Sequence, residues 1–238
     1  MKIVFPHIPK CAGSSVQKQL KARNDVFLDY SNNPLCMHEP DRVTGASEQQ
    51  ALLERLTTMD SWIAFGHFAC SAYNQLPYDR LIILLRSPLE RAVSHFFFIK
   101  NTLVDDDQHR LGYPEVGPIK DGQMSIDQYL ELDHVRSYYS KYYLKDMIVD
   151  ERVVALPVEQ LTTSFQTIAK LSDIRLDASV WSNKGKYESE YESHRGKFAE
   201  DDELMVRLID HTEREVLPVL LRGGTLRRVL SRLSLKGK

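Results

Sequence analysis

A lysine, a glycine and two serines follow one another in a short turn near the start of the chain. They are Lys10, Gly13, Ser14 and Ser15. Residues 2–5 predict an apolar strand before this turn, and a helical pattern begins at Gly13. Backbone N–H groups without acceptors and the positive end of the helix dipole meet at the start of a helix. A phosphate or sulfate is therefore the expected ligand of this turn.

The same turn has a plainer interpretation, a capped helix beside a surface lysine, which Ser14 and Ser15 alone would support. The lysine inside the turn and the two prolines in the segment that leads to it, Pro6 and Pro9, favour an anion site instead. An ordinary nucleotide-binding loop is not expected, because its lysine follows the second glycine. Here the lysine precedes the glycine.

A second candidate anion site lies about seventy residues further on. The aliphatic run 81–85 predicts a central parallel strand that delivers Arg86 to the carboxyl edge of a sheet. Pro88 begins a helix, and Ser94 lies about two turns into it. The arginine fork matches phosphate oxygens and keeps its charge. A strand-end salt bridge for Arg86 and a hydroxyl bonded to its own backbone for Ser94 are the alternatives.

Both segments resemble cofactor sites of sulfotransferases that use 3′-phosphoadenosine 5′-phosphosulfate (PAPS). The run PKCAGSS is similar to their 5′-phosphosulfate loop, in the H-I-P-K-x-x-G-[ST]-[ST] form of carbohydrate sulfotransferases, heparan sulfate enzymes and bacterial relatives among them. The run that begins at Leu85 resembles their 3′-phosphate site, L-R-[DN]-P-x-x-R-x-x-S-x-[YFH], with Ser87 in place of the commoner Asp or Asn. The resemblance implies that the cofactor is held by Lys10, Cys11, Ala12, Gly13, Ser14, Ser15, Arg86 and Ser94.

One histidine is a candidate catalytic base. His67 follows the expected strand 62–65 and so belongs at the same sheet edge as Lys10 and Arg86. It resembles the G-H segment that supplies the base in heparan sulfate 2-O-type enzymes, and the pKa of histidine suits proton acceptance near neutrality. A structural histidine is the alternative. The other candidates for the base are His7 and, more weakly, His38, Glu39 and His95.

Three further segments each have two interpretations. Residues 136–144 are rich in tyrosine with interspersed basic residues and resemble the helix after the acceptor region in these enzymes. They could line a sugar groove. Core packing is favoured for at least two of the four tyrosines. Residues 181–186 occupy the place of a late cofactor loop or form a solvated turn. Residues 101–123 predict one long irregular stretch, functional or merely exposed.

The alternation of strands and helices predicts an α/β fold with a mostly parallel central sheet flanked by helices. The resemblance implies a P-loop NTPase-like sulfotransferase fold in a single domain, 1–238. Besides 2–5, the expected strands are 26–29, 62–65, 81–85 and 153–156. The expected helices after the first are 47–56, 88–100, 125–132, 134–144, 158–171 and 201–217.

The composition is typical of a globular protein, and the net charge of −2 gives no indication of nucleic acid binding. Three cysteines, Cys11, Cys36 and Cys70, have no metal-site spacing and suggest a reducing compartment. Without a signal peptide or a transmembrane run, we expect a cytoplasmic and bacterial protein. Residues 222–238 carry six basic and no acidic side chains in an amphipathic pattern. They either pack on the domain or make weak peripheral contact with an anionic membrane.

The resemblance implies in-line transfer of a sulfuryl group from PAPS to a hydroxyl of an acceptor, a carbohydrate or glycolipid, with release of 3′,5′-ADP and no metal. His67 would take the hydroxyl proton, and Lys10 would neutralise charge on the bridging oxygen. Two other classes stay open. An ATP-dependent small-molecule phosphotransferase would need a lysine after the glycines and an acidic metal ligand. A non-catalytic 3′-phosphonucleotide-binding protein would keep both anion sites and lack the base.

Overall fold

A computed structural model of the chain describes residues 1–29, 43–105, 113–180 and 191–220. His38, Glu39, the segment 181–186 and the basic segment 222–238 lie outside these residues. None of the helices within them is both long and apolar enough to span a membrane.

The described residues form a parallel sheet with the strand order β2-β3-β1-β4-β5. This arrangement confirms the α/β fold class, and each strand lies within one residue of its predicted bounds. Strands β3 and β5 are buried along their whole length, as expected for a sheet covered on both faces. The strands are β1 (Lys2–Pro6), β2 (Val26–Asp29), β3 (Trp62–Gly66), β4 (Arg80–Leu85) and β5 (Val153–Pro157).

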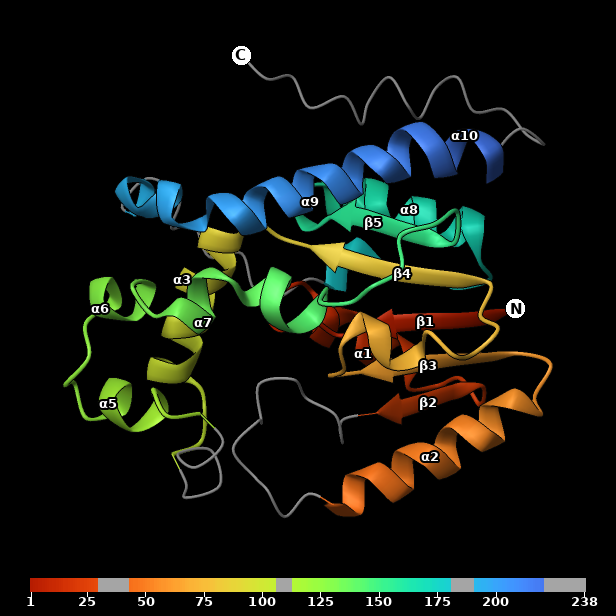
Figure 1. Cartoon of the computed structure of the whole chain (residues 1–238), viewed down its shortest axis with the longest axis horizontal. Coiled ribbons are helices and arrows are strands. Elements are labelled where there is room, and N and C mark those ends of the chain that lie inside the picture. Colours follow the sequence, from red (N-terminus) through yellow and green to blue (C-terminus); the bar gives the residue numbers. More distant parts are fainter. Residues whose placement is uncertain (30–42, 106–112, 181–190, 221–238) are drawn as a thin grey trace.

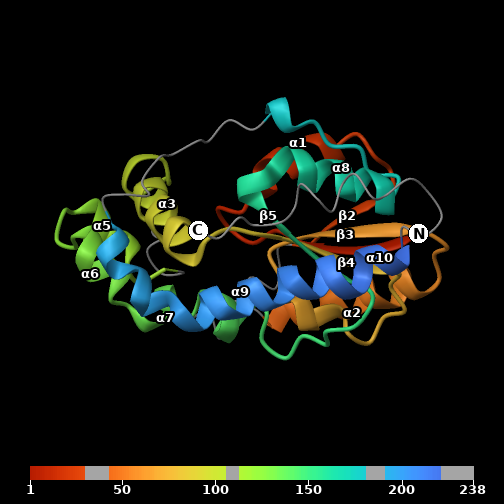
Figure 2. The same cartoon turned by 90° about the horizontal axis from the view of Figure 1, so that it is seen from above.

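Helices cover both faces of the sheet. One face carries α1 (Gly13–Leu20) and α8 (Leu161–Leu171), as Figure 2 shows. The other carries α2 (Val43–Thr57) and α9 (Ala199–His211), which a π-helical turn joins to α10 (Leu217–Leu220). The apolar side chains of these helices pack against the sheet and form the main core with it.

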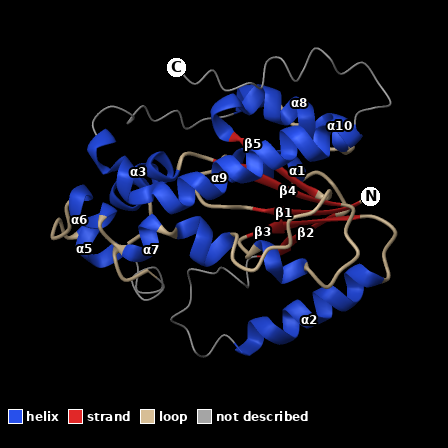
Figure 3. Ribbon diagram, turned by 45° about the horizontal axis from the view of Figure 1, so that its top comes forward, coloured by secondary structure: helices blue, strands red, loops and turns tan. Residues whose placement is uncertain are grey.

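A second group of helices lies beyond the carboxyl ends of the strands (Figures 1 and 3). It has its own apolar core, which Leu89, Phe96 and Ile99 of the longest helix share with the shorter ones. The helices are α3 (Pro88–Asn101), α5 (Val116–Lys120), α6 (Ile126–Leu130) and α7 (Asp133–Arg136). The short turns elsewhere are 3-10 helices at Cys70–Tyr73, Val158–Gln160, Ala178–Val180 and Glu192–Phe198.

Two predictions about local structure are wrong in part. The stretch 101–123 is not irregular throughout, because α5 forms within it and buries Val116 and Ile119 in the second core. The expected helix 134–144 is divided into α7 and a π-helical turn at Tyr139–Tyr143. The backbone leaves the helical region at Ser137, with φ −107° and ψ 39°.

The topology places a crevice between β1 and β4. From β1 the chain passes through α1 to β2 on one side of the sheet, returns to β3, and then crosses to β4 on the other side. Ligands of open parallel sheets bind outside the carboxyl ends of the strands at such a reversal. The two segments predicted to bind anions follow β1 and β4, so they flank this crevice.

Candidate active site

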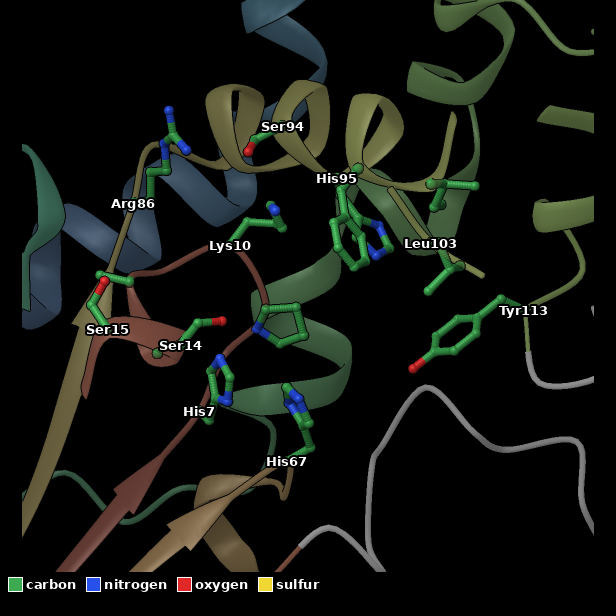
Figure 4. A pocket seen from close by; sticks show the side chains of 15 residues that line it. His7, Lys10, Ser14, Ser15, His67, Arg86, Ser94, His95, Leu103 and Tyr113 are labelled. Atoms are coloured by element: carbon green, nitrogen blue, oxygen red, sulfur yellow. The ribbon is translucent and has the colours of Figure 1, made fainter. Parts of the chain in front are cut away.

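A cavity of about 270 Å³ opens at the crevice between β1 and β4 (Figure 4). It brings together nearly all of the predicted site residues, although they come from three separate parts of the chain. Those that line it are Lys10, Ala12, Gly13, Ser14, Ser15, His67, Arg86 and Ser94. Cys11 does not line it, because its side chain is buried and its N–H donates to the Ile8 carbonyl at 3.1 Å.

The loop after β1 is wound tightly around the start of α1. Lys10 and Ala12 both have positive φ, 68° and 63°, a region that non-glycine residues rarely adopt. Ala12 is the N-cap of α1, and no side chain caps the helix. Ser14 and Ser15 therefore do not act as caps. Within the described residues, the N–H groups of Gly13 and Ser14 have no backbone acceptor, as at any first helical turn, which leaves them for an anion.

Gly13 is required by the packing of His7. A Cβ atom on Gly13 would lie 1.6 Å from Cδ2 of the His7 ring. That ring cannot easily move away, because it is buried and stacks on His67 with ring centroids 4.3 Å apart. His7 thus fills the space behind the loop and supports its first helical turn.

Lys10 reaches from this loop toward α3 (Figure 4). Its Nζ lies 4.3 Å from the centre of the Phe98 ring, and no carboxylate pairs with it among the described residues. Burial, followed by repulsion from Arg86, lowers the pKa of Lys10. A half-buried cation beside another cation and without an acidic partner is an arrangement that a bound anion would stabilise.

Arg86 and Ser94 form the opposite wall of the crevice. Nε of Arg86 lies 3.3 Å from Oε2 of Glu90, one helical turn further on, so the strand-end ion pair named as the alternative role of Arg86 is present. It fixes the guanidinium while the two Nη groups make no hydrogen bond within the described residues. The Ser94 hydroxyl also makes none there, so it is not bonded to its own backbone. Both side chains keep donors for a phosphate.

His67 stands at the end of β3, on the lower rim of the cavity in Figure 4. Gly66 before it allows β2 and β3 to close together, because a Cβ there would lie 1.6 Å from the Asp29 carbonyl oxygen. Burial lowers the pKa of His67 to about 4, and a hydrogen bond to the backbone of His7 partly opposes the shift. The imidazole is therefore neutral at pH 7, and one of its ring nitrogens donates to the backbone of His7.

The far wall of the cavity is mainly apolar. Phe98, Ile99, Leu103 and Tyr113 line it, and the Tyr113 ring lies across the cavity from His67 (Figure 4). His95 also lines it, with Nδ1 at 2.8 Å from the Tyr129 hydroxyl. Burial lowers the pKa of His95 to about 3. This wall has the space and the apolar surface for a group other than the phosphates.

The tyrosine-rich segment does not reach the cavity. Tyr138, Tyr139 and Tyr143 are buried, which confirms that at least two of its tyrosines belong to the core. Its basic residues are paired at the surface, Lys141 with Asp133 and Arg136 with Glu131.

Sequence reasoning missed two side chains that hold the second loop. The Tyr139 hydroxyl bonds to the backbone of Arg86, and Oε1 of Glu159 accepts the Ser87 N–H at 2.9 Å. Both lie more than fifty residues from their partners, and no local pattern indicates such contacts. Among the described residues, no group of three or more His, Cys, Asp or Glu side chains is placed to hold a metal ion.

Comparisons with known proteins give two solved structures and no sequence match. No family model matches the chain, and no curated protein does. A sulfotransferase from Alicyclobacillus acidocaldarius is 14% identical, with 91% of this chain and 97% of that chain covered and a TM-score of 0.42. Mouse sulfotransferase SULT7A1 complexed with PAP is 12% identical, with 99% of this chain and 75% of that chain covered and a TM-score of 0.32. Both are sulfotransferases, the family that the two motifs resemble.

Proposed function

We propose that this chain transfers a sulfuryl group from PAPS to a hydroxyl of an acceptor and releases 3′,5′-ADP. The observation that carries the proposal is that both anion-binding loops open on one cavity, with a neutral imidazole at its rim. Lys10 and Arg86 supply two cations on opposite sides of the crevice, and two separate phosphate groups of one nucleotide would satisfy both.

The two sides divide the nucleotide between them. The N–H groups of Gly13 and Ser14, with Lys10, suit the 5′-phosphosulfate at the start of α1. Arg86 and Ser94 suit the 3′-phosphate, which distinguishes PAPS from ADP-like nucleotides. The ion pair with Glu90 orients the guanidinium for this task.

The proposed reaction is an in-line displacement at sulfur. The acceptor oxygen forms a bond to sulfur while the bond from sulfur to the bridging phosphate oxygen breaks. The hydroxyl proton passes to the neutral imidazole of His67. Lys10 and the N–H groups of the α1 terminus neutralise charge that grows on the bridging oxygen as 3′,5′-ADP leaves.

We propose a carbohydrate or glycolipid as the acceptor, in a form without negative charge. Phe98, Leu103 and Tyr113 offer an apolar surface to the face of a sugar ring or to a lipid chain. Among the described residues that line the cavity, the Lys and Arg side chains are Lys10 and Arg86, and the nucleotide would use both. Among these lining residues, an acidic group on the acceptor would find no further cation.

An ATP-dependent phosphotransferase fits the same cavity less well. Such an enzyme needs a carboxylate that holds Mg²⁺ beside the phosphates. The described residues that line the cavity include no Asp or Glu. A non-catalytic nucleotide-binding protein would show the same two anion sites, so turnover must be measured to separate it from an enzyme.

Nucleotide-dependent melting tests the cofactor. We expect 3′,5′-ADP to raise the melting temperature well above the effect of equal concentrations of ADP, ATP or 5′-AMP, because ligand binding to the folded state stabilises it by mass action. Arg86→Ala should remove the advantage of 3′,5′-ADP. Arg207→Ala, which deletes the same charge from an exposed position on α9, should keep it. Equal stabilisation by ATP and 3′,5′-ADP in the unaltered protein would overturn the proposal.

Turnover tests the reaction. The protein is incubated with PAPS and panels of neutral and anionic glycosides and glycolipids, and release of 3′,5′-ADP is measured. Activity on neutral members supports the acceptor class proposed above. Selective binding of 3′,5′-ADP without turnover on any hydroxyl acceptor would support the non-catalytic alternative.

A further inference from the structure

The hydroxyl of Tyr139 joins the two anion-binding loops beneath the cavity. It lies 2.7 Å from the Arg86 carbonyl oxygen and 3.2 Å from the Arg86 nitrogen. It also lies 3.4 Å from Sγ of Cys11, in the loop after β1. Tyr139 and Cys11 are almost fully buried. One side chain therefore touches both loops at the crevice where β1 and β4 separate.

The protons at this junction can be assigned from chemistry alone. A tyrosine hydroxyl donates one hydrogen bond and accepts two. The Arg86 carbonyl can only accept, so the hydroxyl donates to it and receives the Arg86 N–H. The remaining lone pair faces Cys11, which must then be a thiol that donates. Burial raises the pKa of both Cys11 and Tyr139, which keeps both groups neutral in agreement with this assignment.

The backbone of Arg86 is thus hydrogen-bonded as that of a residue in a sheet would be. Its N–H and C=O both reach one neighbour, as they would in a strand ladder, although β4 itself ends at Leu85. The Tyr139 hydroxyl supplies the pairing one residue beyond the strand. The backbone that carries the guanidinium is fixed in this way from below, while Glu90 fixes its side chain.

Tyr139 is itself held by a buried carboxylate. Oδ2 of Asp201 accepts the Tyr139 N–H at 2.7 Å, and Oδ1 accepts the Ser140 N–H at 2.9 Å. Asp201 belongs to α9 and is fully buried. These bonds start the π-helical turn that carries Tyr139, so the position of its hydroxyl is set by the main core of the molecule.

We propose that Tyr139 is a positioning residue that couples the two anion sites. With the hydroxyl in place, both loops are held at the separation that one nucleotide with phosphates at both ends requires. Without it, Arg86 and Cys11 lose a shared partner. Binding of the 3′-phosphate must then order the second loop, which reduces the binding free energy. This proposal rests on the proposed use of a 3′-phosphonucleotide.

The test measures selectivity rather than stability. Dissociation constants of 3′,5′-ADP and 5′-AMP are determined by calorimetry for the unaltered protein, Tyr139→Phe and Tyr143→Phe. Their ratio reports how much the 3′-phosphate contributes. We expect Tyr139→Phe to reduce the ratio by about fivefold or more, which is typical of coupled sites. Tyr143→Phe removes a hydroxyl from an equally buried tyrosine on the same turn and should keep the ratio.

The outcomes separate this proposal from the function on which it rests. If the unaltered protein does not prefer 3′,5′-ADP, the proposed function is wrong. If it does, and Tyr139→Phe keeps that preference or loses no more of it than Tyr143→Phe, the coupling is wrong and the function stands. Should Tyr139→Phe fail to fold, Asp201→Asn is measured in its place, because it removes one of the two acceptors that position Tyr139. An unchanged ratio in that variant would overturn the proposal.

Discussion

His67 is the residue on which the proposed chemistry depends most. Its pKa of about 4 in the free protein makes it fully neutral at pH 7, which a base requires, but also makes it a weak base. Burial lowers the pKa of His67, and a hydrogen bond to the backbone of His7 partly opposes the shift. A nucleotide with several negative charges would raise it toward neutrality, so substrate binding itself would prepare the base.

Replacement of this imidazole gives a direct prediction. His67→Ala should lower kcat by roughly 10²–10⁴-fold, as for a positioned general base, while the affinity for 3′,5′-ADP stays near that of the unaltered protein. In the unaltered enzyme, the acid limb of kcat/KM for PAPS should lie near the free-protein pKa of about 4. The acid limb of kcat should lie at higher pH.

The control for this prediction is His211→Ala, which removes an imidazole bonded to the Asp150 carbonyl and distant in sequence from the crevice segments. It should leave kcat unchanged. Retained activity in His67→Ala would transfer the role of base to His7 or His95, which line the same cavity.

At the same scale, the sequence allowed the residues of the cavity to be predicted but not the residues that hold them. Lys10, Arg86 and Ser94 stand in short local patterns after recognisable strands. Tyr139 and Asp201 contact these loops or each other across more than fifty residues. Such contacts follow from how the chain packs in three dimensions, which spacing along one sequence does not reveal.

The division of the expected helix 134–144 has a specific cause at the level of elements. In a continuous helix the N–H groups of Tyr139 and Ser140 would donate to carbonyls four residues earlier. They donate instead to Asp201 on α9. The periodic apolar pattern was correct, and a tertiary hydrogen bond then restarted the helix at a new point. Periodicity indicates which side chains are buried. It does not indicate that Asp201 competes with the helix carbonyls for the N–H groups of Tyr139 and Ser140.

The loop after β1 gives a prediction about one element. Gly13→Ala would place a Cβ against the His7 ring, and the ring has little room to move because it stacks on His67. We expect a loss of about 1–3 kcal/mol in the free energy of unfolding, typical of overpacking, together with weaker 3′,5′-ADP binding. Chemical denaturation and calorimetry measure the two effects.

Gly196→Ala is the matched control for that loop. A Cβ on Gly196 meets no atom within 4 Å, so this variant should differ little from the unaltered protein in stability or in binding. If Gly13→Ala behaves like Gly196→Ala, then the close contact between His7 and the loop does not determine its shape.

For the whole molecule, the sheet was the most predictable part. The strands other than β2 are mostly apolar and buried, β2 is partly exposed, and each strand lies within one residue of its expected position. The order of the strands places the two proposed anion sites at one crevice. The second core, formed by α3 and α5–α7, was harder to foresee, because α5, α6 and α7 are short and are stabilised by packing on α3.

Three histidines at the cavity, His7 and His95 buried and His67 partly buried, have a consequence for the stability of the protein in acid. Burial is the main cause that lowers the pKa to about 3 for His7, about 4 for His67 and about 3 for His95. In the unfolded chain each returns to 6.5, the ordinary value. Between these limits the unfolded state binds more protons, so the free energy of unfolding falls as the pH drops from about 6.5 toward 4.

His95→Gln should flatten this dependence, because one imidazole no longer takes up a proton on unfolding. At pH 5 the slope of the unfolding free energy against pH should fall by about one proton, or about 1.4 kcal/mol per pH unit. Tyr129→Phe is the control, since it breaks the same hydrogen bond but keeps the imidazole. It should shift the whole curve and leave the slope unchanged. An unaltered slope in His95→Gln would mean that His95 is already protonated in the folded protein at pH 5, contrary to its burial.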